Sequence, residues 1–184
     1  MIDAYESAKY LARTKTATHI LMLDFDGVLH HEAVYVTPKR GIHVREPGRT
    51  LFEWAHFLVE ALAPYPEVRI VLSTTWCIRP GFARAKSRLP IALRERVIGG
   101  TYHSGVHGAD PHCQLAFRQT SRATQVLADV ARRRPTDWLA LDDDVADWPA
   151  AQLDHLVACD GSAGLSSPAT RELLHARLAR FRHA

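Results

Sequence analysis

The stretch Ile20-Leu21-Met22-Leu23-Asp24-Phe25-Asp26-Gly27-Val28-Leu29 decides the fold, because an unbroken apolar run ends there in two carboxylates and a glycine. Such a run predicts a strand that is buried on both faces, as in a parallel sheet. Since alternate residues of a strand share a face, Asp24 and Asp26 are expected to point into one volume. Burying a carboxylate without a partner is costly, so the pair indicates either a functional site or a polar strand end before a turn.

The composition limits the class of protein. The chain has 184 residues, of which 47% are hydrophobic and 23% charged, which predicts one globular domain over residues 1–184 with an N-terminal arm or helix at 1–18. No apolar stretch approaches the roughly 20 residues that span a bilayer, so we expect no membrane association. Three scattered cysteines favour a reducing cytoplasm over a disulfide framework. The formal net charge of +3 suits an anionic substrate but does not establish nucleic-acid binding.

Apolar runs and amphipathic segments alternate along the rest of the chain. Further strands are expected at residues 68–72, 94–100, 138–141 and 155–159. Helices are expected at residues 50–62, 81–96 with a break at Pro90, 121–134 and 167–181. Residues 30–49 predict a loop or short hairpin, too small for a large cap domain, and residues 101–111 an irregular loop. The alternation indicates an α/β fold, a three-layer doubly wound parallel sheet of about five strands.

Polar side chains follow three of the predicted strands, at the edge where doubly wound sheets bind ligands. They are Asp24 with Asp26, Ser73 with Thr74, and Asp142 with Asp143. Clustered carboxylates repel one another unless a cation lies between them, and Mg²⁺ prefers a few carboxylates together with waters and a phosphate. We therefore expect a magnesium site that uses Asp24 and Asp143, with Asp142 beside them and the backbone carbonyl of Asp26 as a further ligand.

The ordered motifs resemble those of the haloacid dehalogenase-like (HAD) superfamily of aspartate-nucleophile phosphatases. The matches are Asp24-Phe25-Asp26-Gly27-Val28 for the first motif, Ser73 or Thr74 for the second, Arg122 or Arg118 for the third, and Asp142-Asp143 for the fourth. More narrowly, residues 72–76, 97–101, 141–143 and 164–166 are similar to the HAD domain of Swiss-army-knife RNA-repair proteins. The chain departs from that pattern in two places. The arginine expected just after Trp76 stands at Arg79, and the third motif has Arg instead of Lys.

The resemblance implies a Mg²⁺-dependent phosphatase. Asp24 would attack the phosphorus and form an aspartyl-phosphate, while Asp26 would act as general acid and then as base. Arg122 would offset phosphoryl charge, and the hydroxyl of Ser73 or Thr74 would orient a phosphoryl oxygen. The expected substrate is a phosphomonoester, either a small molecule such as a nucleotide or a nucleic-acid end. Residues expected to contact it are Thr75, Arg79 and His30.

Two other functions are compatible with the same motifs. One is phosphoryl transfer to an acceptor other than water, which the sequence does not separate from hydrolysis. The other is a non-catalytic module that binds a metal or a phosphate, but such a module would not need the acid/base residue Asp26.

Three further features of the sequence have simpler explanations than a role in catalysis. His103, His107, His112 and Cys113 include zinc-ligand types, but their spacing matches no zinc signature, so we expect a loop that rims the pocket. Trp76 is expected to pack under the second strand in preference to stacking on a nucleobase. Cys77 is not expected to act as a nucleophile beside a complete set of aspartates.

Overall fold

A five-stranded parallel sheet forms the centre of the computed structural model, which describes residues 19–182. Its strands are β1 (His19–Leu23), β4 (Arg69–Leu72), β5 (Val97–Gly100), β6 (Asp137–Asp142) and β7 (Leu156–Ala158). Their order is β5-β4-β1-β6-β7, and every neighbouring pair is parallel. The predicted fold class is thus confirmed. The arm or helix expected at residues 1–18 lies outside the described residues.

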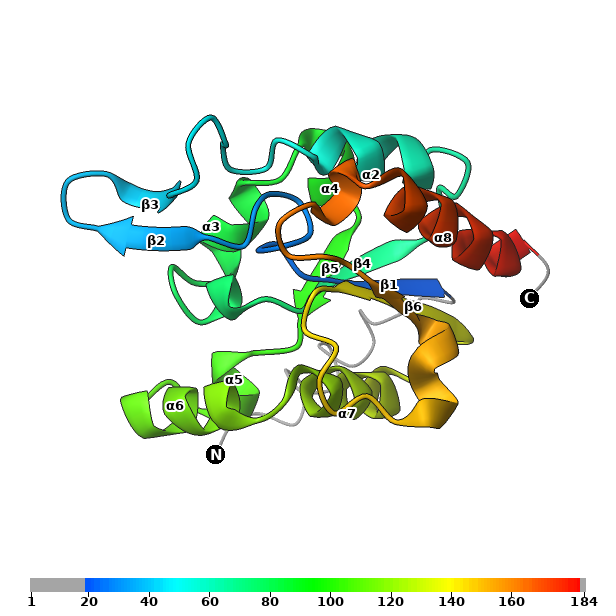
Figure 1. Cartoon of the computed structure of the whole chain (residues 1–184). Coiled ribbons are helices and arrows are strands. Elements are labelled where there is room, and N and C mark those ends of the chain that lie inside the picture. Colours follow the sequence, from blue (N-terminus) through cyan, green and yellow to red (C-terminus); the bar gives the residue numbers. More distant parts are fainter. Residues whose placement is uncertain (1–18, 183–184) are drawn as a thin grey trace.

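Helices cover both faces of this sheet (Figure 1). Helices α2 (Ala55–Leu62) and α8 (Pro168–Leu178) lie on one face, and α7 (Arg122–Arg133) lies on the other. The remaining helical segments are α3 (Phe82–Ser87), α4 (Ile91–Arg94), α5 (Ser104–His107), α6 (Pro111–Gln119), and the 3-10 turns η1 (Thr75–Cys77), η2 (Ala150–His155), η3 (Gly164–Ser166) and η4 (Ala179–Arg182). Within residues 19–182, no helix has the length and apolar character needed to cross a membrane.

Residues 20–23 of strand β1 are all apolar because the strand contributes to two cores. Leu21 and Leu23 pack in the cluster that contains the buried residues of α2 and α8, whereas Ile20 and Met22 pack with those of α7. All five residues of β1 are buried, and β4 and β6 pair with it on either side. This central position explains why the apolar run is unbroken and why the residue after it, Asp24, enters the middle of the sheet edge.

A short hairpin is the insertion between β1 and α2. It consists of β2 (Val34–Thr37) and β3 (Gly41–Val44), which pair antiparallel and project from the carboxyl end of the sheet (Figure 1). The predicted loop or short hairpin is therefore a hairpin. Helix α2 begins later than expected, because residues 51–54 form turns in which Phe52 has a positive φ of 60°.

The prediction of an irregular loop at residues 101–111 is wrong in part. It contains the short helix α5, and α6 follows immediately. Asp110 caps α6 by accepting hydrogen bonds from the backbone N–H groups of His112 and Cys113 at 2.9 and 3.1 Å, and Pro111 occupies the first turn. An Asp-Pro start of this kind is a recognised helix signal that the glycine and histidine content of the segment obscured.

Candidate active site

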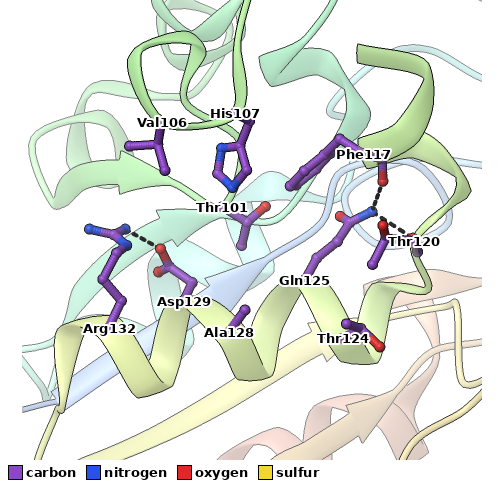
Figure 2. Close-up of a pocket in the computed structure, with 10 residues that line it drawn as sticks. All are labelled: Thr101, Val106, His107, Phe117, Thr120, Thr124, Gln125, Ala128, Asp129 and Arg132. Carbon is purple, nitrogen blue, oxygen red and sulfur yellow. Dashed lines mark hydrogen bonds and ion pairs between the residues drawn. The ribbon is translucent and has the colours of Figure 1, made fainter. Parts of the chain in front are cut away.

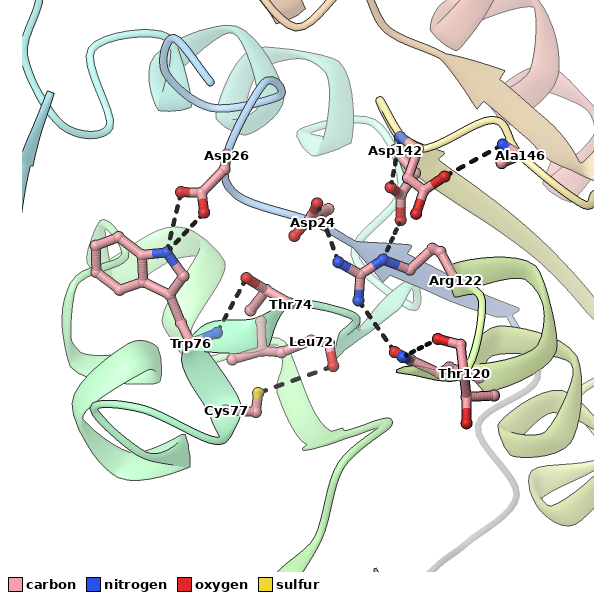
Figure 3. Close-up of polar contacts among 12 residues, drawn as sticks. Asp24, Asp26, Leu72, Thr74, Trp76, Cys77, Thr120, Arg122, Asp142 and Ala146 are labelled. Carbon is pink, nitrogen blue, oxygen red and sulfur yellow. Dashed lines mark hydrogen bonds and ion pairs between the residues drawn. The ribbon is translucent and has the colours of Figure 1, made fainter. Parts of the chain in front are cut away.

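The carboxyl ends of β1, β4 and β6 bring the motif residues together (Figure 3). Asp24 follows β1 and its backbone N–H donates to the carbonyl of Leu141 in β6, while the N–H of Ser73 donates to that of Leu23. These backbone bonds extend the sheet by one residue and fix where each side chain emerges. Asp24 and Asp142 are only 4% and 1% exposed, so the site is built into the interior edge of the sheet.

Arg122 is the cation of the site. It begins α7, whose N-cap is Ser121, and its buried side chain lies between two acids. Its Nη2 is 3.4 Å from Oδ2 of Asp24 and its Nε is 3.2 Å from Oδ2 of Asp142 (Figure 3). Burial is the largest single effect and opposes the charge of Arg122, but the nearby acids Asp24, Asp142, Asp144 and Asp143 together outweigh it and raise the pKa of the guanidinium. Arg118 is exposed on α6, so the structure brings Arg122 to the site and not Arg118.

Three carboxylates surround a position suited to a cation. Asp24, Asp142 and Asp143 each offer an oxygen, and these oxygens lie within 4.8 Å of one another. Burial and the neighbouring Asp24 raise the pKa of Asp143 to about 7, and the same two causes raise that of Asp142. Burial also raises the pKa of Asp24, against the effect of Arg122. One guanidinium therefore does not neutralise three buried acids, and the set fits Mg²⁺.

Asp142 has capacity left for such an ion. Its Oδ2 is buried and has no hydrogen-bond partner, since the nearby Nε of Arg122 is not aligned for a hydrogen bond. Its other oxygen, Oδ1, accepts from the backbone N–H of Asp144 at 3.1 Å. A buried acceptor without a donor is costly, and a cation bound there would satisfy it.

Asp26 lies in a different environment from these three acids. Its side chain is 31% exposed and it is not part of the carboxylate cluster. The indole N–H of Trp76 donates to both of its oxygens, at 3.0 Å to Oδ1 and 3.2 Å to Oδ2 (Figure 3). His30 Nε2 is 2.9 Å from Oδ1. Trp76 is buried, as the sequence predicted.

The expectation that His30 contacts substrate is wrong. Its side chain is fully buried. The turn that begins at Gly27, with φ +69°, returns the chain so that His30 lies beneath Asp26 and bonds it. His30 follows the first motif directly, which suggested a place beside the substrate, but the tight turn directs its ring into the core.

Thr74 is the hydroxyl that acts on Asp24. It lowers the pKa of that carboxyl against the larger effect of burial, and its Oγ1 accepts a hydrogen bond from the backbone N–H of Trp76. Ser73 is fully buried, and its Oγ has no hydrogen-bond partner. Thr75 and Arg79 are exposed at η1 and just beyond it. Their contact with substrate stays a prediction.

Two glycines allow the backbone to approach Asp143. A Cβ on Gly27 would lie 2.1 Å from Oδ2 of Asp143, and a Cβ on Gly161 would lie 3.0 Å from the same atom. The Gly161 Cβ would also meet Oε2 of Glu32 at 2.2 Å, and Glu32 contributes to the raised pKa of Asp143. Sequence reasoning used Gly27 for its turn but missed Gly161 and Glu32. The Asp-Gly pair at residues 160–161 was the available signal.

A cavity of about 360 Å³ lies between α7 and the α5–α6 segment (Figure 2). Its lining includes the rings of His107 and Phe117 and the side chains of Thr101 and Gln125. Gln125 accepts a hydrogen bond from Nη1 of Arg122 at 3.2 Å. The cavity therefore borders the residue that supports Arg122, and His107 belongs to its wall. That the segment with His103 and His112 rims the active-site pocket stays a prediction.

Comparison with known proteins agrees with the geometry. The family model described as the HAD domain in Swiss Army Knife RNA repair proteins matches residues 20–170, from β1 into α8. Searches of curated proteins and of solved structures found no match. The matched region contains Asp24, Thr74, Arg122 and the pair Asp142-Asp143, and it confirms the resemblance inferred from the motifs. The chain belongs to the family of HAD domains found in Swiss Army Knife RNA repair proteins, and through it to the HAD superfamily of phosphatases and hydrolases.

Proposed function

We propose that the chain is a Mg²⁺-dependent phosphatase that hydrolyses phosphomonoesters through an aspartyl-phosphate on Asp24. The observation that carries the proposal is the contrast between the two aspartates of the first motif. Asp24 is buried beside Arg122 and two further acids, whereas Asp26 is accessible and held by hydrogen-bond donors. Two carboxyl groups in environments this different are suited to separate roles as nucleophile and as acid/base.

Asp24, Asp142 and Asp143 are the residues that would hold the metal ion. When bound, Mg²⁺ supplies positive charge that polarises the phosphoryl group and stabilises the transition state. The backbone carbonyl of Asp26 remains a predicted further ligand.

In the first step, an oxygen of Asp24 attacks the phosphorus in line while the bond to the leaving oxygen breaks. Asp26 gives its proton to that oxygen, so an alcohol leaves and Asp26 becomes a carboxylate. Arg122 lies against Asp24 and offsets the charge of the phosphoryl oxygens, and Thr74 donates a hydrogen bond on the same side. The residues that already surround Asp24 thus surround the group transferred to it.

In the second step, Asp26 takes a proton from a water molecule as that water attacks the phosphorus of the intermediate. The bond between Asp24 and phosphorus breaks, inorganic phosphate leaves, and both aspartates return to their starting forms. The cysteine behind Thr74 does not compete as nucleophile, because burial raises the pKa of Cys77 to about 12 and keeps the thiol protonated.

For the substrate we propose a phosphate at the end of an RNA or DNA chain or, as the smaller form of the same chemistry, a nucleotide. The insertion after β1 is a hairpin of two four-residue strands, which leaves room beside the partly exposed Asp26. The family to which the chain belongs is named for its presence in RNA repair proteins, which supports the same substrate class.

The test is phosphate release from p-nitrophenyl phosphate, nucleotides, and oligonucleotides with a 3′ or 5′ phosphate, with Mg²⁺ and with a chelator. Asp24→Asn should lower the rate by at least about 10³-fold while leaving the circular dichroism spectrum unchanged. Asp147→Asn is the matched control, because Asp147 is exposed in the segment after β6. Substantial activity in Asp24→Asn would contradict the nucleophile assignment.

A further inference from the structure

The carboxylate of Asp26 is held by two side chains from different segments. Trp76 comes from η1, fifty residues along the chain, and His30 from the turn after β1. Both are buried, whereas the Asp26 side chain that they hold is 31% exposed. Among the site carboxylates, the side-chain N–H of Trp76 and Nε2 of His30 hydrogen-bond only with Asp26, and not with Asp24, Asp142 or Asp143.

Both groups donate hydrogen bonds to Asp26. An indole N–H is a donor only. For His30, Nδ1 is buried without a hydrogen-bond partner, and an orphaned N–H is rarer in proteins than an under-satisfied acceptor. The hydrogen-bond network therefore assigns the proton to Nε2, which donates to Oδ1 of Asp26 at 2.9 Å.

The two donors leave the oxygens of Asp26 unequal. Oδ1 accepts from both Trp76, at 3.0 Å, and His30, whereas Oδ2 accepts only the longer branch from Trp76, at 3.2 Å. A carboxylate oxygen has two lone pairs. Oδ1 is therefore fully used, and Oδ2 is the oxygen with capacity for a proton or a water molecule.

Aromatic packing keeps the two donors in place. Phe52 contacts the rings of His30 and Trp76 edge-on, with centroids 4.9 and 5.6 Å apart, and Phe25 contacts Phe52 and Trp76 at 5.1 and 5.8 Å. Such edge-to-face pairs restrict ring rotation. The packed rings thus fix the two N–H donors, and the donors in turn fix the orientation of the Asp26 carboxylate.

We propose that Trp76 and His30 are positioning residues that hold Asp26 so that its Oδ2 gives the proton to the leaving oxygen. The inference rests on the proposed phosphatase function. As the phosphorus–oxygen bond breaks, the proton on Oδ2 moves to the leaving oxygen, and the negative charge left on Asp26 is stabilised at Oδ1 by the two donors. The second step returns a proton from water to Oδ2.

The test compares two substrates that differ in their need for an acid. An alkyl phosphate such as glycerol 2-phosphate needs a proton on its leaving oxygen, whereas p-nitrophenolate leaves without one. The value kcat/KM is used because it reports the transfer to Asp24 and excludes the later hydrolysis. Trp76→Phe, which keeps a ring and removes the N–H, should lower kcat/KM about 10²-fold for the alkyl phosphate and far less for the aryl phosphate.

His30 gives an independent variant pair. His30→Leu should also lower the alkyl-to-aryl ratio of kcat/KM, and His30→Gln, which places an N–H near the position of Nε2, should restore part of it. Phe52→Leu is the packing control, because Phe52 touches both rings but not Asp26. Because Phe52 helps to hold both rings, this ratio should fall, but by less than in Trp76→Phe, since both N–H donors remain.

The outcomes separate the two proposals. If the wild type is active and the alkyl-to-aryl ratio of kcat/KM is the same in Trp76→Phe and His30→Leu as in the wild type, the positioning role is overturned and the phosphatase function stands. A fall of this ratio in Phe52→Leu as large as that in Trp76→Phe also overturns the positioning role, because loss of ring packing and not loss of the N–H donor would then be the cause. A wild type that releases no phosphate from either substrate overturns the phosphatase function, and the positioning role with it.

Discussion

Replacing Asp143 with Asn is expected to stabilise the metal-free protein near neutral pH. Burial and the neighbouring Asp24 raise the pKa of Asp143 from its ordinary 3.8 to about 7. At about 1.4 kcal/mol per pH unit, that rise corresponds to roughly 4 kcal/mol of folding free energy lost when the carboxyl is ionised. Asp143 is only partly buried and solvent screens its charge, so we expect about half of this, ~2 kcal/mol, which is roughly 4–8 °C in Tm.

The sign of the pH dependence follows from proton uptake on folding. Between about pH 4 and pH 7 the folded state holds a proton on Asp143 that the unfolded state has lost, so the stability of the wild type falls as the pH rises through this window. Below about pH 4 the carboxyl is protonated in both states, and the Asn variant should no longer differ from the wild type. Asp24 and Asp142 are present in both proteins, and Asp143 contributes to the raised pKa of Asp142, so the difference between the two Tm curves reports Asp143 together with its electrostatic effect on these neighbours.

Thermal melts followed by circular dichroism, in a chelator across this pH range, measure the difference. Added Mg²⁺ should reverse it. At a free concentration about 100 times its dissociation constant, a ligand adds about 2.7 kcal/mol to the folded state, and the variant lacks one of the three carboxylates that would hold the ion. Asp147→Asn removes an exposed acid from the same segment and should follow the wild type. Equal Tm values for wild type and Asp143→Asn at every pH would refute the reasoning.

Two further predictions test the cation and the glycine of the site. Arg122→Met removes the buried charge beside Asp24 and should lower kcat about 10²–10³-fold. Arg118→Met, at an exposed position, should not lower kcat, and equal losses in the two variants would contradict the assignment of Arg122. Gly27→Ala places a Cβ 2.1 Å from Oδ2 of Asp143 at a residue with φ +69°. We expect this variant to lose about 2 kcal/mol of unfolding free energy and its Mg²⁺-dependent activity, and an unchanged denaturant midpoint would argue against the steric conflict.

The sequence predicted the residues around Asp24 because sheet topology alone brings them together. Asp24, Thr74 and Asp142 lie at or just beyond the ends of β1, β4 and β6, and these strands are neighbours in a parallel sheet. Parallel strands have their carboxyl ends at one edge, so a polar residue after each apolar run is placed near the others. Arg122 was predicted from the family resemblance, with Arg118 as the alternative, and the structure shows that a helix beginning after Ser121 directs its first residue at the same edge.

The residues around Asp26 were not predictable in the same way. The bond from Trp76 joins positions fifty residues apart, and it depends on how η1 turns after β4. The inward direction of His30 depends on the turn at Gly27, which the sequence indicated without giving its course. Helix α6 was missed for a related reason, because local capping by Asp110 outweighed the glycines and histidines that suggested a loop. In each case the position of the residue depends on the course of a short irregular segment, which the hydrophobic pattern of the sequence does not give.

The two aspartates of the first motif are therefore supported by different parts of the fold. The environment of Asp24 is made by strands and by the first residue of α7, so changing it means changing the sheet edge. The environment of Asp26 is made by a turn and a 3-10 segment packed through Phe52, so it changes with loop sequence alone. Loops accept substitutions more readily than central strands do. For the proposed phosphatase it follows that the centre around Asp24 is fixed by the fold, whereas the fit between Asp26 and the leaving group is adjustable through the turn that contains His30 and the segment that contains Trp76.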